Sequence, residues 1–246
     1  MDAVELARRL PDVPRWLETR SMLLSGTGEV IGAGPEGLVV TDAEDGLVCV
    51  SGRPGAGDIR EAVSRLSRVS GARTVISAPE DREHVAESLP GYRAVRAVLH
   101  LPGGDGLRLP EVPENLVRLV EPREVEESLE RLPDDLRREL RVAVRRSPVA
   151  AVLFEDTPVS FCYAAARTET LWDISIDTLE GFRRLGLAGM CVSHMVGVMG
   201  REGLAPVWGA EEPNVGSLAL AGKLGFVPVD EFAVFHPLRQ AEPEAG

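Results

Sequence analysis

The feature of this chain that most constrains its fold is a strand-like segment followed by a basic turn and an apolar helix. Leu171–Thr178 has the pattern of a strand, Glu180–Ala188 contains two glycines and two arginines, and an apolar helical run follows from Ala188 to Met199. In such a unit the backbone N–H groups of the turn and of the first helical residues converge on one point, where the helix dipole favours an anion. Arg183 and Arg184 can add charge-assisted hydrogen bonds. The pattern therefore predicts a turn that holds phosphate oxygens.

A second block of residues follows at a fixed distance from this turn. It consists of Asn214-x-x-Ser217 and then Leu224-Gly225-Phe226. With both blocks the chain resembles the GNAT superfamily of acyl-CoA-dependent N-acyltransferases, whose loop pattern Arg/Gln-x-x-Gly-x-Gly/Ala is matched by Arg183–Ala188. The interval between the blocks holds one helix and one strand, as the family requires, and the resemblance covers about residues 114–238.

The resemblance implies a fold, a cofactor and a reaction. The fold is α+β, with a central mixed, mostly antiparallel sheet, flanking helices and a splayed parallel strand pair, here Leu171–Thr178 and Val207–Ala210. Acetyl-CoA would lie between these strands, and an amine of a small molecule or a protein would attack it directly. The backbone of Ile176 and Thr178 would pair with the pantetheine arm, and the turn would hold the pyrophosphate. The implied cofactor-binding residues are Ile176, Thr178, Arg183, Arg184, Leu185, Gly186, Leu187, Ala188, Gly189, Asn214 and Ser217.

Candidate catalytic residues come from a polar stripe on the first of these strands. Asp173, Ser175 and Asp177 alternate with apolar residues and share one face of a strand that would be apolar throughout if helices covered both sides. We expect Asp177, the nearest to the opening, to act as base or amine anchor, with Asp173 and Glu211 as further candidates. Alternatively, the two aspartates pair with arginines of the preceding helices or face solvent, and Glu211 is a solvated loop acid.

One family feature is missing. Many family members carry a tyrosine, the general acid, at the position of Ala221. A thiolate is a tolerable leaving group, because the pKa of an unperturbed thiol is about 8.5, so water could supply the proton. Tyr163 is a remote substitute. The alternative function is a non-catalytic acyl-CoA-binding or regulatory module. An ATP-binding turn is disfavoured because the Lys-Ser/Thr end of a P-loop is absent.

The chain divides into two halves. A stretch rich in proline and glycine, 104–113, predicts a linker between an N-terminal domain, 1–103, and a catalytic domain, 114–240, with a disordered tail at 241–246. Around the strand and turn described above, the second half should contain a strand 116–120, helices 123–131 and 134–145, a hairpin of strands 149–154 and 159–166, a helix that ends at about 202, a strand 207–210, a helix 217–223 and a strand 230–236.

The first half repeats the later part of this order. The expected elements are a strand 46–50, a glycine turn 51–57, a helix 59–69, a strand 73–77, a helix 79–89 and a strand 93–101. We interpret it as a shortened, degenerate copy of the same fold, the alternative being an unrelated α/β cap. The copy should not catalyse, because its turn lacks the loop pattern, Pro54 removes one N–H, and no Asn-x-x-Ser block follows.

Composition limits the remaining possibilities. The net charge of −12 speaks against sequence-independent nucleic-acid binding. Most of the acidic excess lies after residue 110, where it either attracts cationic amines or simply solubilises the chain. Three separated cysteines predict no disulfide and no metal site, and the absence of an apolar span or signal peptide predicts a cytoplasmic protein without membrane contact. The single lysine beside 26 arginines is typical of GC-rich bacterial coding. A homodimer is compatible with the sequence, but nothing requires one.

Overall fold

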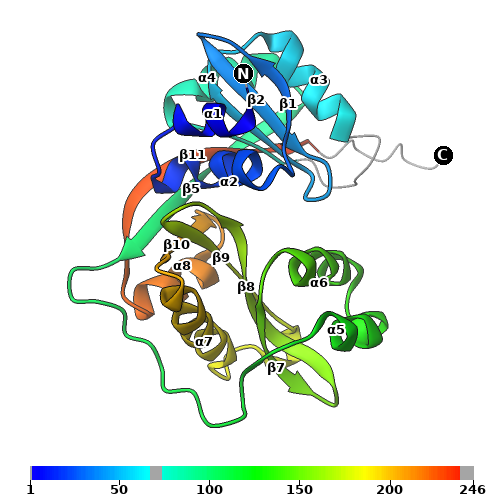
Figure 1. Ribbon diagram of the computed structural model, residues 1–246, viewed down its shortest axis with the longest axis vertical. Coiled ribbons are helices and arrows are strands. Elements are labelled where there is room, and N and C mark those ends of the chain that lie inside the picture. The colour runs from blue at the N-terminus through cyan, green and yellow to red at the C-terminus, as the bar shows by residue number, and fades with distance from the viewer. Residues whose placement is uncertain (1, 67–73, 239–246) are drawn as a thin grey trace, which may run out of the picture.

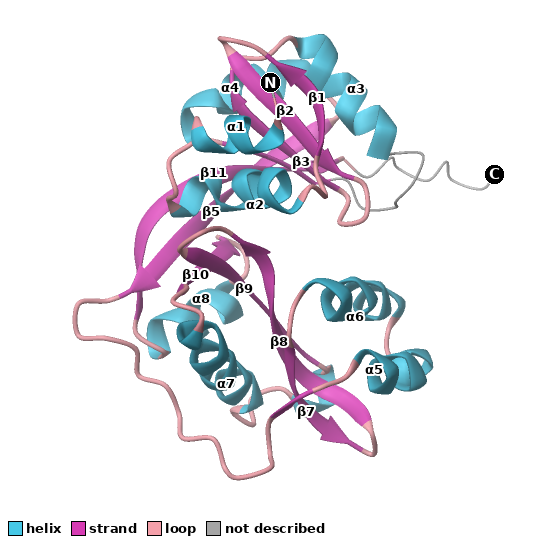
Figure 2. Cartoon of the chain, viewed as in Figure 1, coloured by secondary structure: helices cyan, strands magenta, loops and turns pink. Residues whose placement is uncertain are grey.

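The computed structural model describes residues 2–66 and 74–238, and one continuous sheet runs through both halves of the chain (Figure 1). Within the described residues the strand order is β1-β2-β3-β4-β11-β5-β10-β9-β8-β7-β6. All neighbours are antiparallel except the pairs β3–β4 and β9–β10, so the predicted mixed, mostly antiparallel sheet is confirmed. Figure 2 shows helices flanking this sheet in both halves. The predicted tail 241–246 lies outside the described residues.

The first half contains more regular structure than the sequence predicted. The elements between residues 46 and 101 occur with small shifts, although the end of the predicted helix at 67–69 and the start of the predicted strand at Arg73 lie outside the described residues. Two helices and a hairpin before residue 43 were not predicted. The observed elements are α1 (Ala3–Arg8), η1 (Pro14–Trp16), α2 (Leu17–Ser25), β1 (Glu29–Ala33), β2 (Gly37–Asp42), β3 (Leu47–Gly52), α3 (Ala56–Leu66), β4 (Thr74–Ser77), η2 (Pro79–Asp81), α4 (Arg82–Ser88) and β5 (Tyr92–Pro102), the η elements being 3-10 helices.

The second half follows the predicted order with shifts in several strand bounds. The first strand is shorter than expected and the last one begins four residues earlier, because its first residues pair with β5, a partner distant in the sequence. The observed elements are β6 (Arg118–Leu119), α5 (Pro122–Ser128), η3 (Leu129–Arg131), α6 (Asp134–Arg146), β7 (Val149–Phe154), β8 (Thr157–Arg167), β9 (Leu171–Thr178), η4 (Glu180–Phe182), α7 (Leu187–Arg201), β10 (Ala205–Glu211), α8 (Val215–Lys223) and β11 (Phe226–Pro237).

The two halves exchange their last strands. β5 of the first half lies between β11 and β10, and β11 of the second half pairs with β4. β5 and β11 pair with each other along their whole length, from Phe226↔Pro102 to Pro237↔Tyr92, with a register shift after Pro228. A proline donates no backbone hydrogen bond, which fits a local irregularity at that point. Neither half therefore completes its sheet without the other.

The first half corresponds to the second element by element. The series α1-α2-β1-β2-β3-α3-β4-α4-β5 matches α5-α6-β7-β8-β9-α7-β10-α8-β11, and in both the parallel strand pair encloses a crossover helix. Among the strands and α-helices, only the short β6 lacks a counterpart in the described residues of the first half. This correspondence, with its symmetric strand order, supports the interpretation of the first half as a degenerate copy.

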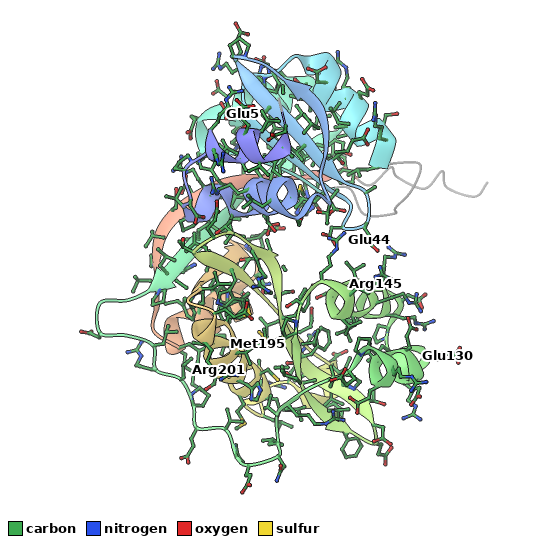
Figure 3. All side chains as sticks on the ribbon, viewed as in Figure 1. Glu5, Glu44, Glu130, Arg145, Met195 and Arg201 are labelled. Atoms are coloured by element: carbon green, nitrogen blue, oxygen red, sulfur yellow. The ribbon has the colours of Figure 1, made fainter. Side chains whose placement is uncertain are left out.

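The principal core of the second half lies between α7 and the sheet. Cys191, Met195 and Met199 recur at helical spacing on one face of α7 and are fully buried against Trp172 and Trp208. Met195 is labelled in Figure 3 between the helix and the strands. This packing fixes α7, and hence the turn before it, relative to β9 and β10.

The segment between the halves, 103–117, contains no helix or strand and lies along α7 and α8. The backbone N–H of Arg108 donates to the carbonyl of Leu224 at 2.8 Å, and the Ser193 hydroxyl donates to the carbonyl of Pro110 at 2.9 Å. No helix in the described part of the chain is long and apolar enough to cross a membrane.

Candidate functional site

The site is centred where the two parallel strands of the second half separate. β9 and β10 pair only over Leu171–Asp173 and Ala205–Val207, and both strands continue beyond that point without further pairing to each other. The predicted splayed pair is thus present. At the last pair, Val207↔Asp173, the Asp173 side chain lies beside Gly209 of β10, whose backbone N–H donates to its carboxylate. The opening of the sheet therefore begins at an acidic side chain.

The turn after β9 has the geometry expected of an anion site. Arg184 and Gly186 adopt left-handed backbone conformations, with φ of 64° and 84°, which turns the chain sharply into α7. No side chain of the described residues caps the N-terminus of α7, and Leu185 is 62% exposed. The first amides of this fifteen-residue helix are thus free to meet an external anion. Both arginines of the turn are exposed, and Arg183 Nε donates to the carbonyl of Thr178 at 3.0 Å.

The second predicted block forms the start of α8, next to this opening. The Asn214 side chain caps the helix by accepting from the backbone N–H of Ser217 at 3.1 Å. The Ser217 hydroxyl accepts from the indole N–H of Trp208 at 2.9 Å. Both residues therefore have a structural role at the start of α8, and their predicted contact with a cofactor stays a prediction.

The polar stripe of β9 faces α6 rather than α7. Glu139 of α6 accepts hydrogen bonds from the Tyr163 hydroxyl at 2.9 Å and the Ser175 hydroxyl at 3.2 Å, and Tyr163 pairs with Ser175 across β8 and β9. Burial raises the pKa of Tyr163 further above its usual value, and the neighbouring Glu139 adds to the effect. The Tyr163 hydroxyl therefore keeps its proton and donates it in the hydrogen bond to Glu139. Asp177, at the end of the stripe, is half-buried.

Asp173 and Glu18, which line the site, are carboxyl groups with raised pKa values. Burial raises the pKa of Asp173 to about 7. Burial also raises the pKa of Glu18 well above its usual range, with the negative charge of Asp173 as the next cause. Glu18 lies on α2 of the first half, and α2 packs against β8 and β9. The sequence analysis missed Glu18 because it did not predict α2.

Two adjoining cavities, of about 760 and 710 Å³, lie over this face of the sheet between the two halves. Glu18, Asp173 and Glu211 line both of them. Glu211 is at the end of β10 and accepts a hydrogen bond from His236 Nε2 at 2.8 Å, provided that this nitrogen carries the proton. Two of the three candidate carboxylates, Asp173 and Glu211, are thus brought together, whereas Asp177 lines neither cavity.

Ion pairs between α6 and the β2–β3 turn close one side of the second cavity. Arg146 contacts Asp42, Asp45 and Glu44, the last at 2.7 Å. Arg145 contacts Glu44 as well, and Figure 3 shows these two side chains facing each other from the two halves. The first half is therefore part of the wall around the opening.

The corresponding turn of the first half is already filled. The N–H of Gly52, at the end of β3, donates to Asp81 Oδ2 at 2.7 Å, and the N–H of Arg53 donates to the carbonyl of Glu36 at 2.7 Å. Pro54 has no N–H to offer. Internal groups thus take the place that an external phosphate would need.

Comparison with known proteins agrees with this geometry. The family model described as GNAT acetyltransferase matches residues 150–235, which include the splayed strands, the turn and α8. This segment of the chain is similar to the GNAT acetyltransferases.

A curated relative matches about a third of the chain, and two solved structures share its fold over nearly the whole length. An uncharacterized N-acetyltransferase of Bacillus subtilis (strain 168), YdfB, is 34% identical over 86 residues, and the match spans 35% of this chain and 33% of that protein. A GCN5-related N-acetyltransferase-like protein from Streptococcus suis 89/1591 superposes with a TM-score of 0.68 at 18% identity, over 96% of this chain and 98% of its own. A tandem GNAT protein from the clavulanic acid biosynthesis pathway superposes with a TM-score of 0.54 at 11% identity, over 98% and 94%.

Proposed function

We propose that this protein is an N-acetyltransferase that transfers an acetyl group from acetyl-CoA to an amine. The observation that carries the proposal is the uncapped N-terminus of α7, reached through a left-handed turn directly beside the separated ends of β9 and β10. In such a site the backbone amides donate hydrogen bonds to the pyrophosphate of CoA. The gap between the two strands can accept the extended pantetheine arm. The expected binding residues are those given by the family pattern, from Ile176 and Thr178 through Arg183–Gly189 to Asn214 and Ser217.

The second turn of the molecule offers an internal comparison. The turn after β3 has the same place in its half, but Asp81 and Glu36 occupy its amides. In the turn after β9 the Arg183 N–H donates to the carbonyl of Glu180, but no side chain of the described residues caps the first amides of α7. This difference supports one cofactor site per chain, in the second half.

We assign the base to Asp173 in preference to Asp177. Acetyl-CoA, when bound, supplies a thioester carbonyl carbon as electrophile. Asp173 lies where the strands separate, and a carboxyl group with a pKa of about 7 can accept a proton from an ammonium at neutral pH. The neutral amine then forms the C–N bond, the C–S bond breaks, and its electron pair leaves with sulfur. Glu211 remains a second candidate that borders the same cavities.

No tyrosine of the described residues is placed to protonate the leaving sulfur. Ala221 is fully buried in the core beneath α8, and the Tyr163 hydroxyl donates to Glu139. We therefore assign the final proton to solvent, which is reasonable for a thiol whose ordinary pKa is about 8.5.

The experiment that tests the cofactor site changes the charge at the start of α7. In Ala188→Glu, the added carboxylate lies in the first turn of the helix. There the helix dipole should leave the stability of the fold unchanged or raise it by about 0.3–1 kcal/mol. The same negative charge repels a pyrophosphate. Ala188→Gln is the uncharged control of the same shape. We expect calorimetric titration to show acetyl-CoA binding by the wild type and by Ala188→Gln, and none by Ala188→Glu at unchanged or higher thermal stability.

Three outcomes separate the alternatives. Equal affinity in Ala188→Glu and wild type would exclude this turn as the phosphate site. Binding of ATP in preference to acetyl-CoA would exclude the acetyltransferase assignment. Binding of acetyl-CoA without CoA release for any amine would favour the non-catalytic acyl-CoA-binding module.

A further inference from the structure

The cavity over β5, β10 and β11 has an apolar floor. It is lined by Leu99 of β5, by Phe232 and Val234 of β11, and by Leu17 of α2. Alkyl and aromatic groups offer no hydrogen bonds, so a polar body lying here would lose its hydration without compensation. The floor therefore selects for an apolar group. Because β5 and β11 are the exchanged strands and α2 belongs to the first half, the duplicated architecture creates this surface.

Glu18 and Asp173 provide a polar end to the same cavity. Both line it, they interact electrostatically, and they come from different halves of the chain. Two of the arginines that line the adjoining cavities are already engaged. Arg15 contacts Asp230 and Glu80, and Arg146 contacts the β2–β3 turn. A cation placed between the two carboxyl groups would relieve the repulsion that burial imposes on them.

We propose that the acceptor is a small amphiphilic primary amine, whose ammonium group is bound by Glu18 and Asp173 and whose apolar body lies on Leu99, Phe232 and Val234. Glu18 is then an acceptor-binding residue contributed by the degenerate half. This inference rests on the proposed function, because it names the acceptor of that reaction. Residues of both halves line the cavities, so we propose a small molecule rather than a protein side chain as the acceptor.

The two carboxyl groups have different roles toward the ammonium group. One N–H proton passes to the Asp173 carboxylate, and the freed electron pair forms the C–N bond to the acyl carbon. Glu18 holds the nitrogen during this step by accepting a second N–H. The C–S bond then breaks with its electron pair on sulfur, the nitrogen loses its second proton to solvent, and solvent protonates the thiolate. The products are the N-substituted amide and CoA, and the proton on Asp173 is released to solvent.

The test separates acceptor binding from acyl transfer. Calorimetric titration of the full chain, without acetyl-CoA, compares n-hexylamine with 2-(2-aminoethoxy)ethanol, which has the same number of heavy atoms but a polar body. We expect hexylamine to bind at least tenfold more tightly. Glu18→Gln, which keeps the shape and removes the charge, should weaken hexylamine binding by about tenfold or more, as expected for a lost hydrogen bond to a charged group. Glu87→Gln, at an exposed position of α4, is the matched control.

Kinetic measurement completes the test. With acetyl-CoA present, Glu18→Gln should raise the KM for hexylamine by a similar factor and leave the KM for acetyl-CoA unchanged. Thermal melting verifies that the variant folds, and we expect no loss of stability because the surroundings of Glu18 disfavour its charged form.

The outcomes distinguish the two proposals. Equal affinity for the two amines, a better response to a lysine-containing peptide, or unaltered hexylamine binding in Glu18→Gln would each overturn the acceptor assignment while leaving the acetyltransferase proposal intact. Hexylamine binding that depends on Glu18, together with a failure to bind acetyl-CoA, would support the acceptor pocket and overturn the proposed reaction.

Discussion

At the scale of single residues, the site depends on where side chains stand relative to the separation of β9 and β10. Asp173 and Asp177 are equivalent in the sequence, since both belong to the same alternating stripe. The structure distinguishes them, because Asp173 is the one beside Gly209 and within both cavities. An aspartate in that position is kept partly protonated near neutral pH by burial.

This protonation predicts a pH dependence with a definite sign. A base must be ionised, so the rate of acyl transfer should rise with pH through about 7 and then level off. Because the folded-state pKa of Asp173 is raised, its contribution to stability is full below about pH 4 and is lost as the pH rises through about 7. Asp173→Asn should lower kcat by about 10²-fold or more and remove the rise with pH. It should also be more stable than wild type at about pH 8.

Rate measurements and melting curves on both sides of neutral pH check both expectations, with Asp177→Asn as the matched control. A wild-type pH profile in Asp173→Asn would remove this residue from the mechanism. A large loss confined to Asp177→Asn would restore the simpler prediction from the sequence.

Gly186 gives a second prediction at this scale. Its φ of 84° is a conformation that residues with a Cβ rarely adopt, although the space around it is open except for Met190 Cε at 3.9 Å. Gly186→Ala should therefore destabilise the fold by about 1 kcal/mol or more through backbone strain. Gly200→Ala, an exposed position of α7 with no neighbouring atom within 4 Å, should stabilise it by about 0.5–1 kcal/mol. Urea unfolding of both variants measures the difference, and equal stabilities would contradict the conformational argument.

At the scale of elements, α6 and the β2–β3 turn are connected by ion pairs of unequal burial. The Asp42 side chain is 3% exposed, and Arg146 contacts it, whereas the pair between Arg145 and Glu44 is about half exposed on both sides. Arg146→Met should cost about 1–3 kcal/mol, because it leaves a buried carboxylate without its charged partner. Arg145→Met should cost no more than about 0.5 kcal/mol. Chemical denaturation measures the free energy of unfolding of both variants. A similar loss of stability in both would show that the burial of Asp42 does not determine the strength of the ion pair.

The comparison of prediction and structure also belongs to this scale. The strand, turn and helix at 171–199 could be predicted because alternation, a glycine and helical spacing are local signals. Helix α2 was missed since its nine residues, Leu17–Ser25, bury Thr19 and Arg20 together with apolar side chains and show no clear apolar stripe. Without α2 there was no reason to consider Glu18. The extension of β11 to Phe226 depends on pairing with β5, which no local pattern encodes.

At the scale of the whole molecule, the exchange of β5 and β11 explains how a copy with a filled turn can still contribute to one site. Each half places its last strand beside the parallel pair of the other, so the floor over which the two cavities lie cannot be assigned to either half alone. A duplicated fold of this kind can lose the cofactor turn in one copy and keep its helices and strands as walls for the other. The filled amides around Gly52 and the position of Glu18 are consistent with that division.

The exchange makes a strong prediction for the separated halves. A cut within 103–106, in the irregular segment, leaves every strand intact but divides the chain into 1–104 and 105–246. Expressed alone, each fragment lacks an inner strand and exposes unpaired backbone edges, so we expect it to be unfolded or aggregated. Co-expressed, the fragments should assemble, because β5 and β11 pair along their whole length. Size-exclusion chromatography and circular dichroism measure both states, and acetyl-CoA titration measures the site. If fragment 105–246 alone were folded and bound acetyl-CoA with the affinity of the intact chain, the exchanged strand would be dispensable, and the second half would have to complete its sheet in another way.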